Sequence, residues 1–221
     1  HSHESILNGY QKTNISHKFK CMKTKYKRPL DIIIILIAHC FPPFTLLWLL
    51  IWAVIPISIW IQDRGPIFYS QRRIGKDGKI FVIRKFRTMI PDAEATTGIV
   101  WSSKDDPRIT RLGKVLRWTA LDELPQLWNI INGDMTLVGP RSERPELHNE
   151  FSTRIPGFDL RLKVRPGLTG LAQIKGSYNS PPEEKLRHDL DYIKQMNLLL
   201  DIKIIMLSIW NTITGKWDRP D

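Results

Sequence analysis

Residues 30–61 form the feature that most limits the fold. In these 32 consecutive positions Asp31 is the one side chain with a formal charge. A bilayer crossing needs about 20 apolar residues, and a helix in a soluble core is rarely apolar on every side over such a length. The run is also too long for the apolar part of a signal peptide. We therefore predict that this segment lies in a membrane.

Pro42 and Pro43 interrupt this run near its middle. A proline has no N–H and its ring clashes with the preceding turn, so two in succession should break a helix or kink it strongly. Basic residues favour the cytoplasmic side of a membrane. Both flanks are basic, with Lys23, Lys25, Lys27 and Arg28 before the run and Arg64, Arg72, Arg73 and Lys76 after it. The pattern favours a re-entrant helix over residues 29–61, and a kinked single span is the alternative.

Two further regions flank the apolar run. Residues 1–28 carry seven basic residues and one acidic residue, Glu4. This basic N-terminal segment either binds anionic lipid or is a solvated lead-in. Residues 62–221 have the mixed composition of a soluble domain and are numerous enough to bury a core. We expect this part of the chain to carry the chemistry.

Composition excludes several classes of protein. The chain has 221 residues, a net charge of +11 and two cysteines, Cys21 and Cys40. Two cysteines, one of them inside an apolar run, exclude a disulfide scaffold. Five signatures of metal, nucleotide and hydrolase sites are absent, namely HExxH, CxxC, the P-loop, GxSxG and GxGxxG. The excess of cations alone would suit nucleic acid, but no RNA- or DNA-binding motif is present.

Residues 62–132 contain the signals of a β-hairpin and two helices. Segments 66–69 and 80–83 are rich in β-formers, and a turn signal at 75–78 lies between them. Asp106 and Pro107 predict the start of a helix with apolar positions at Ile109, Leu112, Val115 and Leu116. A second helix is predicted to start near Thr119, as a variant of the capping box, and to end at Asn132–Gly133.

The second helix brings two carboxylates to its N-terminus. Asp122 and Glu123 are adjacent, and the helix dipole and free N–H groups favour negative charge at that end. An ionised carboxylate held there could act as a nucleophile or as a metal ligand, although acidic residues at N-termini are most often plain caps. Arg117 and the glycine-containing turns 138–141 and 166–170 surround the pair in the sequence. Arginine forks and glycine turns suit phosphate, so the set favours a phosphate-and-metal site.

The C-terminal part predicts two more helices. The first runs from about Pro182 to Asn197 and carries Asp189 and Asp191, which ordinary solvated helix faces explain. Residues 198–210 are apolar with two charges. That segment either lies in the membrane interface or forms a core helix.

Several of these segments together resemble one family. A proline-broken apolar segment is followed in order by RKFRTM, RWTALDELPQLWNIINGDMTLVGPR, KVRPGLTGLAQIKG and LDIK. This order is similar to that of the bacterial sugar transferases, the monotopic phosphoglycosyl transferases, over most of the chain. The resemblance implies a helix-rich α+β fold. It would combine a re-entrant membrane helix, a short β-hairpin and amphipathic interfacial helices around an active site at the cytoplasmic face, with residues 62–221 as the catalytic domain.

The resemblance also implies a reaction. A sugar-1-phosphate moves from a UDP-sugar to polyprenyl (undecaprenyl) phosphate and UMP is released, as the first membrane step of exopolysaccharide or other surface-glycan synthesis. Asp122 is then the nucleophile of a covalent aspartyl-phosphosugar intermediate, and Glu123 and Asp122 hold Mg²⁺. The phosphate- and nucleotide-binding positions are Lys85, Arg117, Pro140, Arg141, Arg161, Arg165 and Asp189.

The same family implies a setting. We expect the cytoplasmic face of the bacterial inner membrane, membrane lipids as partners and no nucleic acid, and we leave a homodimer open. Larger relatives carry further N-terminal membrane helices and a further domain, so this chain is expected to be a short member or part of a larger one.

Two positions depart from the family pattern. Ser142 stands where a second proline is expected, which puts the shape of that turn in question, and Ser177 stands where relatives often have arginine. The segment GPRSERPE resembles the hexose-1-phosphate-transferring group, which favours UDP-glucose or UDP-galactose as the donor. Two rival functions stay open: a membrane-tethered basic binding protein, and an inverting glycosyltransferase that would release UDP.

Overall fold

A computed structural model describes residues 24–42, 44–93, 95, 106–176 and 180–216. The apolar run forms two helices, α3 (Lys27–Cys40) and α4 (Phe44–Asp63). Phe41 has an extended backbone at the end of α3, with φ −80° and ψ 115°, so the helix stops where Pro42 follows. The predicted break is therefore present, although Pro43 lies outside the described residues.

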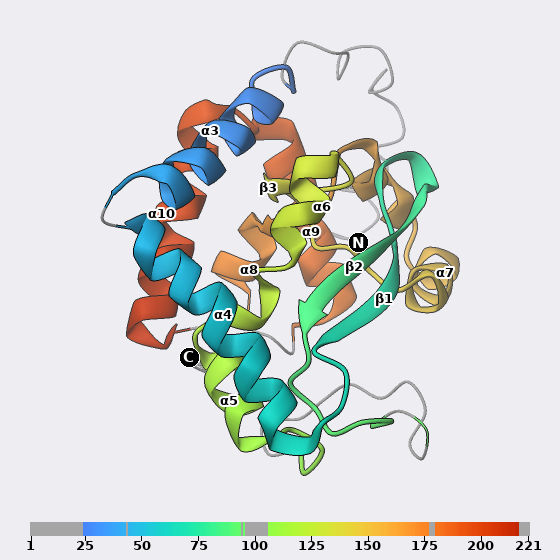
Figure 1. Cartoon of the computed structure of the whole chain (residues 1–221). Coiled ribbons are helices and arrows are strands. Elements are labelled where there is room, and N and C mark those ends of the chain that lie inside the picture. The colour runs from blue at the N-terminus through green and yellow to red at the C-terminus, as the bar shows by residue number, and fades with distance from the viewer. Residues whose placement is uncertain (1–23, 43, 94, 96–105, 177–179, 217–221) are drawn as a thin grey trace.

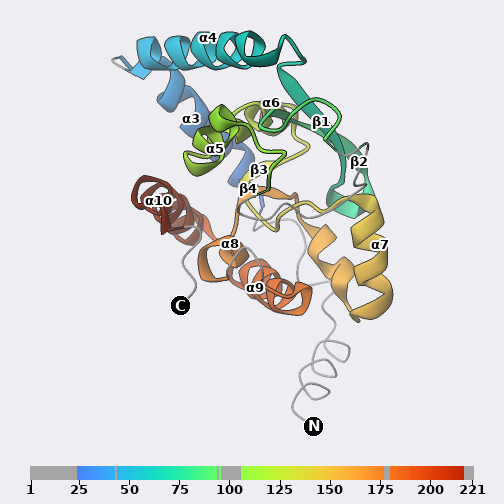
Figure 2. The same cartoon turned by 90° about the horizontal axis from the view of Figure 1, so that it is seen from below.

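The two helices leave the break in different directions. In Figure 2, α4 lies along one side of the molecule and α3 runs from its end toward the centre. His39 and Trp48 stack across the break with ring centroids 4.6 Å apart. Within the described residues, α4 is the one helix that is long and apolar enough to cross a membrane by length and composition. Most of its apolar side chains are exposed, and Ile55 and Ile59 are its buried residues.

Two small sheets lie in the rest of the chain (Figure 1). Strands β1 (Phe68–Ile74) and β2 (Ile80–Phe86) form an antiparallel pair, joined through a 3-10 turn, η1 (Lys76–Gly78). The predicted hairpin is confirmed. Strands β3 (Thr136–Val138) and β4 (Gly167–Thr169) form a parallel pair. Two segments of the sequence that carry glycine turns are thus brought side by side.

The first predicted helix begins later than the sequence suggested. It is α5 (Arg111–Trp118), and its cap is Thr110, whose side chain accepts a hydrogen bond from the N–H of Gly113. The expectation that Asp106 and Pro107 open this helix is wrong. Asp106 instead accepts hydrogen bonds from the backbone and the side chain of Arg108, which holds residues 106–108 in a turn.

The capping box predicted at Thr119 is also wrong. Thr119 ends α5, where its hydroxyl donates back to the carbonyl of Val115 at 2.8 Å. The chain then forms a separate 3-10 turn, η2 (Leu121–Glu123), before α6 (Gln126–Asn132). The predicted end of that helix is confirmed, because Gly133 follows it with φ 89°.

The remaining elements cover the other side of β3 and β4. They are α7 (Pro145–Arg154), the 3-10 segment η3 (Phe158–Lys163), α8 (Leu171–Lys175), α9 (Pro182–Gln195) and α10 (Leu198–Thr214). Helices α9 and α10 confirm the two predicted C-terminal helices. In α10 Ile204 is fully buried whereas Leu199, Met206 and Ile213 are exposed, so this helix has a core face and an uncovered apolar face.

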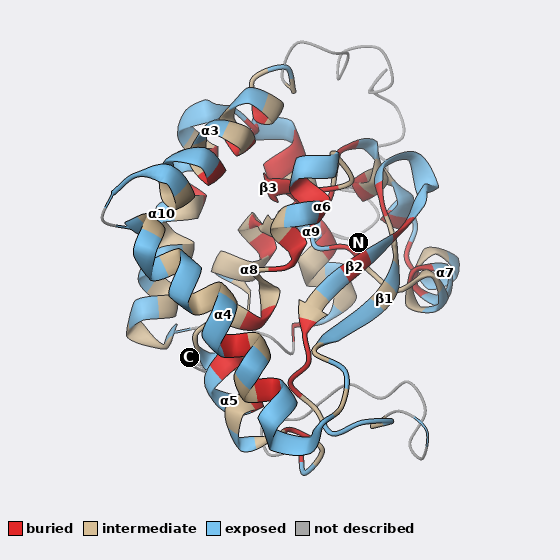
Figure 3. Cartoon of the chain, viewed as in Figure 1, coloured by how far each residue is buried: buried red, intermediate tan, exposed pale blue. Residues whose placement is uncertain are grey.

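The main core lies between α3, β2, β3, α6 and the last two helices. Its most deeply buried members are Ile83, Ile130, Met135, Val138, Tyr192, Met196 and Ile204. Figure 3 shows these buried segments in red at the centre, with α4 and the outer side of α10 mostly exposed. A second cluster joins Ile55 and Ile59 of α4 to Phe86 and Leu116. Leu121 and Leu124, on either side of the acidic pair, pack against the same cluster. The apolar helix α4 is therefore in contact with the turn that carries the pair.

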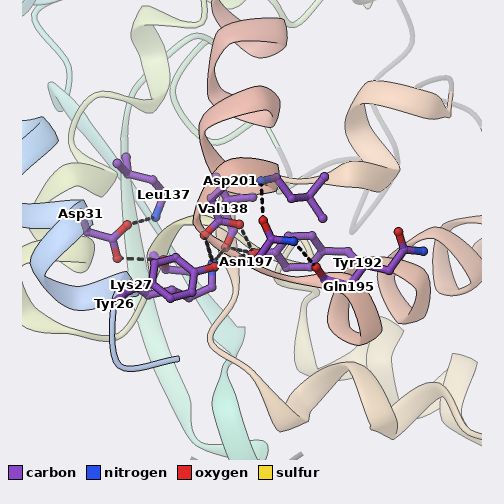
Figure 4. A network of polar contacts seen from close by, with 11 residues as sticks. Tyr26, Lys27, Asp31, Leu137, Val138, Tyr192, Gln195, Asn197 and Asp201 are labelled. Atoms are coloured by element: carbon purple, nitrogen blue, oxygen red, sulfur yellow. Dashed lines mark hydrogen bonds and ion pairs between the residues drawn. The ribbon is translucent and has the colours of Figure 1, made fainter. Parts of the chain in front are cut away.

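A buried polar network fastens the start of α3 to the body (Figure 4). The ammonium group of Lys27 donates to Asp201 at 2.7 Å, to the hydroxyl of Tyr192 at 2.5 Å and to the carbonyl of Val138 at 2.8 Å. Tyr26 donates to the same Asp201 carboxylate at 2.9 Å. A buried charge is stable only when it is paired in this way. The network joins α3, β3, α9 and α10 at one point.

Asp31, the single charge of the apolar run, belongs to the same junction. Its carboxylate accepts from the hydroxyl of Thr136 at 2.7 Å and from the N–H of Leu137 at 3.0 Å. Both partners are in β3. The first turns of α3 are thus held inside the protein by polar contacts, and the uncovered apolar surface begins beyond them.

Candidate active site

A strained turn presents the acidic pair. Ala120 adopts the left-handed conformation, with φ 55° and ψ 15°, which costs an alanine about 1–2 kcal/mol. It reverses the chain between α5 and η2, and Leu121 and Leu124 pack into the cluster beneath α4. This packing holds Asp122 and Glu123 in one short turn in front of α6. Strain of this kind is concentrated at functional sites.

Glu123 is held ionised by two cations. Lys85 of β2 donates to its Oε1 at 2.5 Å and Arg141 donates to the same oxygen at 2.8 Å. Burial alone would raise the pKa of Glu123, but the charges of Arg141 and Lys85 outweigh it and hold that pKa well below its usual range. Within the described residues, the other oxygen, Oε2, accepts no hydrogen bond.

Asp122 is buried and lacks such a partner. No group in the described part of the chain forms a hydrogen bond or ion pair with its carboxylate. Burial raises the pKa of Asp122 to about 6. Lys85, Arg117 and Arg141 lower this pKa and the charge of Glu123 raises it. A desolvated carboxylate with no bonded partner is a stronger nucleophile than a paired one.

Arg117 approaches the pair from the last turn of α5. Its Nε donates to the hydroxyl of Thr88 at 2.9 Å, and its charge is among those that lower the pKa of Asp122. The close packing of α5 on the segment after β2 requires Gly113, where a Cβ would lie 2.0 Å from the carbonyl oxygen of Thr88. Thr88 is a residue that the sequence did not single out.

The Pro140–Arg141 turn is built on glycine contacts. A Cβ on Gly167 would lie 2.1 Å from the backbone nitrogen of Gly139, so the two glycine turns pack directly against each other. The N–H of Gly167 donates to the carbonyl of Pro140 at 2.9 Å. At position 142, where a second proline was expected, the backbone carbonyl of Ser142 accepts from Nη1 of Arg73 at 2.8 Å, which fastens this end of the turn to β1. Arg73 is thus a second residue that sequence reasoning missed.

Arg161 and Asp189 lie behind this turn. Nη2 of Arg161 lies 2.7 Å from Oδ2 of Asp189 and donates to the carbonyl of Arg141 at 2.8 Å. Both side chains are almost completely buried, with 4% and 2% exposure. Burial raises the pKa of Asp189 to about 6, although Arg161 opposes the rise. The structure places these two residues beside the backbone of Arg141, not beside Asp122.

Arg165 lies at the other end of α6. Its Nε donates to the carbonyl of Gly133 at 2.8 Å. Arg28 joins it there by donating to the carbonyls of Ile130 and Ile131. These arginines satisfy the free carbonyls at the C-terminus of α6, whereas the acidic pair precedes its N-terminus. Ser177, the other questioned position, lies outside the described residues.

Gln126, the first residue of α6, is a buried amide three positions after Glu123. It is 4% exposed, and its Nε2 has no acceptor within the described residues. Asn129, one turn later, donates to the carbonyl of Val82 in β2 at 2.8 Å. The sequence spacing did not predict a role for either residue. An amide without a hydrogen-bond partner can be recognised only once the packing around it is known.

The donor set suits a magnesium ion. In the described part of the chain no group of three or more His, Cys, Asp and Glu side chains comes together. Mg²⁺ is usually bound by one or two carboxylates together with substrate phosphates. Asp122 and Oε2 of Glu123 could supply such carboxylate oxygens, and Arg117 and Arg141 could offset the charge of phosphates bound beside them.

Comparisons with known proteins show which family the chain resembles. The family model described as bacterial sugar transferase matches residues 22–215. The chain is 38% identical over 192 residues to a UDP-N-acetylgalactosamine-undecaprenyl-phosphate N-acetylgalactosaminephosphotransferase of Aeromonas hydrophila, covering 86% of this chain and 44% of that protein.

Two glucose-1-phosphate transferases are similar to the chain as well. The UDP-glucose:undecaprenyl-phosphate glucose-1-phosphate transferase of Xanthomonas campestris is 40% identical over 167 residues, covering 73% of this chain and 34% of that protein. The protein of the same description from Caulobacter vibrioides is 36% identical over 194 residues, covering 85% and 70%. The chain spans less than half the length of the first two relatives.

Proposed function

Because the chain belongs to the bacterial sugar transferase family, we propose that it transfers a sugar-1-phosphate from a UDP-sugar to undecaprenyl phosphate. The observation that carries this proposal is the acidic pair. Among the described residues, a buried Asp122 with no bonded partner lies next to a Glu123 held ionised by Lys85 and Arg141, and the flanking Leu121 and Leu124 pack against the apolar helix α4. A charged site next to an apolar helix would let both a soluble diphosphate donor and a lipid acceptor reach the same carboxylate.

The first chemical step uses Asp122 as the nucleophile. Its carboxylate oxygen attacks the sugar-bearing β-phosphorus, a new P–O bond forms, and the bond to the bridging oxygen breaks with release of UMP. A carboxylate nucleophile divides one difficult transfer into two easier ones. Arg117, Lys85 and Arg141 offset the negative charge that gathers around the phosphorus.

The second step regenerates the carboxylate. A phosphate oxygen of undecaprenyl phosphate attacks the aspartyl-bound phosphorus, and the P–O bond to Asp122 breaks. The product is the undecaprenyl diphosphosugar. Asp122 and Oε2 of Glu123 would hold Mg²⁺, which supplies charge neutralisation for the two phosphates when bound.

A hexose-1-phosphate is the group that we favour. The segment 139–146 resembles the hexose-transferring group, and glucose-1-phosphate transferases are among the relatives. The Aeromonas relative is named for N-acetylgalactosamine. UDP-glucose, UDP-galactose and UDP-N-acetylgalactosamine are therefore the donors to compare first.

For the membrane segment we propose a monotopic, re-entrant arrangement at the cytoplasmic face of the inner membrane. The break after α3 supports it, as do the contacts that hold Lys27 and Asp31 inside the protein. A segment whose first turns are fastened to the catalytic body cannot carry that end across the bilayer. The exposed apolar faces of α4 and α10 supply the surface for lipid.

One experiment tests the reaction. The purified chain is incubated in detergent with Mg²⁺, undecaprenyl phosphate and each UDP-sugar in turn, and the released nucleotide is identified. UMP together with a lipid-linked diphosphosugar supports the proposal. Release of UDP would show transfer of the sugar without phosphate. No release with any donor would contradict the proposal for the chain as it stands.

A further inference from the structure

A buried charge cluster supports the Arg141 turn from behind. The guanidinium of Arg161 contacts two carboxylates, Asp189 at 2.7 Å and Glu143 at 3.4 Å. It also donates to the backbone carbonyl of Arg141 at 2.8 Å and lies over the ring of Phe158, 4.8 Å from its centroid. Glu143 follows Arg141 by two positions and so ties Arg161 to the same turn.

We propose that Arg161, held by Asp189 and Glu143, is a positioning residue that acts through Arg141. It fixes the backbone of Arg141 so that this side chain reaches Glu123 and the donor diphosphate. The inference rests on the function proposed above. It replaces direct phosphate binding, the role that the family resemblance suggested for Arg161 and Asp189.

Burial and existing hydrogen bonds both argue against direct phosphate contact by Arg161. Its side chain is 4% exposed, whereas that of Arg141 is 42% exposed. Both terminal nitrogens of the Arg161 guanidinium already donate to protein acceptors, Nη1 to Glu143 and Nη2 to Asp189 and the carbonyl of Arg141. Arg141 reaches Glu123 at 2.8 Å and is the arginine of the two that a soluble donor can meet.

The effect of the cluster should be confined to Arg141. Neighbouring parts of the turn have their own hydrogen bonds: the N–H of Gly167 donates to the carbonyl of Pro140, Nη1 of Arg73 to that of Ser142, and the N–H of Ile74 to that of Glu143. Weakening the Arg161 cluster therefore loosens one peptide and leaves the rest of the turn in place.

A double-mutant cycle tests this coupling. Asp189→Asn and Arg141→Ala are made singly and together, and UMP release is measured with Mg²⁺ and UDP-sugar but no acceptor. Coupled neighbours show non-additive effects. We expect Asp189→Asn to slow release about tenfold in the wild-type background, and less than about twofold when Arg141 is already alanine. An equal loss in both backgrounds would overturn the proposal, because Arg161 would then act independently of Arg141.

A matched control separates positioning from stability. Arg154 forms an exposed ion pair with Glu150 at 2.8 Å, and we expect Arg154→Met to leave the rate unchanged. Rates are compared at a temperature where thermal unfolding shows every variant to be folded. If Asp189→Asn is unfolded at that temperature, Glu143→Gln takes its place in the double-mutant cycle. It weakens the longer of the two ion pairs of Arg161, and we expect it too to slow UMP release only when Arg141 is present.

Hydrogen exchange supplies a readout that does not depend on turnover. Asp189→Asn should speed exchange of the backbone amides of Arg141 and Ser142, which flank the carbonyl that Arg161 holds, with no change in β1 and β2. Unchanged exchange at the turn would overturn the positioning role even if the enzyme were active. If the wild-type chain released no UMP, the proposed reaction would be contradicted. The hydrogen-exchange result would still test whether the cluster holds the backbone of Arg141.

Discussion

The ammonium group of Lys85 lies 2.5 Å from Oε1 of Glu123, across 38 positions of sequence. This contact joins the inner face of the hairpin to the turn that carries Asp122. Arg141, from a third part of the chain, donates to the same oxygen. Within the part of the chain that the structure describes, two cations bind one oxygen of Glu123 and none bonds to Asp122, which is the physical basis for proposing different roles for the two acids.

The first prediction concerns those roles. With donor and Mg²⁺ but no acceptor, the wild type should release UMP in a burst of up to one equivalent and gain the mass of one phosphosugar. Asp122→Asn keeps the shape but removes the nucleophilic charge, so burst and adduct should fall by about 10³-fold or more. Glu150→Gln, on an exposed helix face, is the control. A near wild-type burst from Asp122→Asn would move the nucleophile to another carboxylate.

The second prediction concerns pH. As the proposed nucleophile, Asp122 would have to be ionised to attack, and burial raises its pKa to about 6. The burst rate should therefore be constant above that pH and fall about tenfold per pH unit below it. Lys85→Met removes a cation that lowers this pKa, so the acid limb should move to higher pH. Asp189 also has a pKa of about 6, and the limb should persist in Asp189→Asn if Asp122 is its source.

The third prediction concerns topology. In a chain whose two cysteines are replaced by serine, Lys25→Cys and Gln62→Cys place one thiol at each end of the apolar run. If the run is re-entrant, neither thiol should react with an impermeant reagent added outside intact cells, and both should react after lysis. Replacing Pro42 and Pro43 by leucine should make a single span more favourable, because the break is removed. Labelling of one end alone in the unchanged run would indicate a true crossing.

The fourth prediction concerns the junction beneath α3. Lys27 and Asp201 form a buried ion pair at 2.7 Å. Asp201→Leu leaves the ammonium group unpaired and should lower the free energy of unfolding by about 3–5 kcal/mol. The double variant Lys27→Met with Asp201→Leu should lose less, because no unpaired charge remains. Urea unfolding in detergent, followed by tryptophan fluorescence, measures both. Equal losses in the single and double variants would mean that the charge pairing is unimportant.

Local chemistry in the sequence predicted much of the framework. The apolar run and its prolines predicted two apolar helices with a break, and the turn signal at 75–78 predicted the hairpin. These features depend on periodicity and backbone preference within a few residues, which a sequence displays directly. The starts of the next two helices were placed wrongly. At Thr110 and Thr119 the side chains bond to neighbouring backbone groups, and several polar residues competed for each capping position.

The roles of the arginines were decided by the tertiary structure. In the sequence, Arg141, Arg161 and Arg165 are equivalent cations near glycine turns. Packing brings Arg141 to Glu123, buries Arg161 against Asp189 and sends Arg165 to the carbonyl of Gly133. An ion pair forms between groups that the fold brings within about 4 Å, and no local pattern specifies that distance. The sequence alone therefore determined which residue types the site contains, and only the packing decided which of them meet.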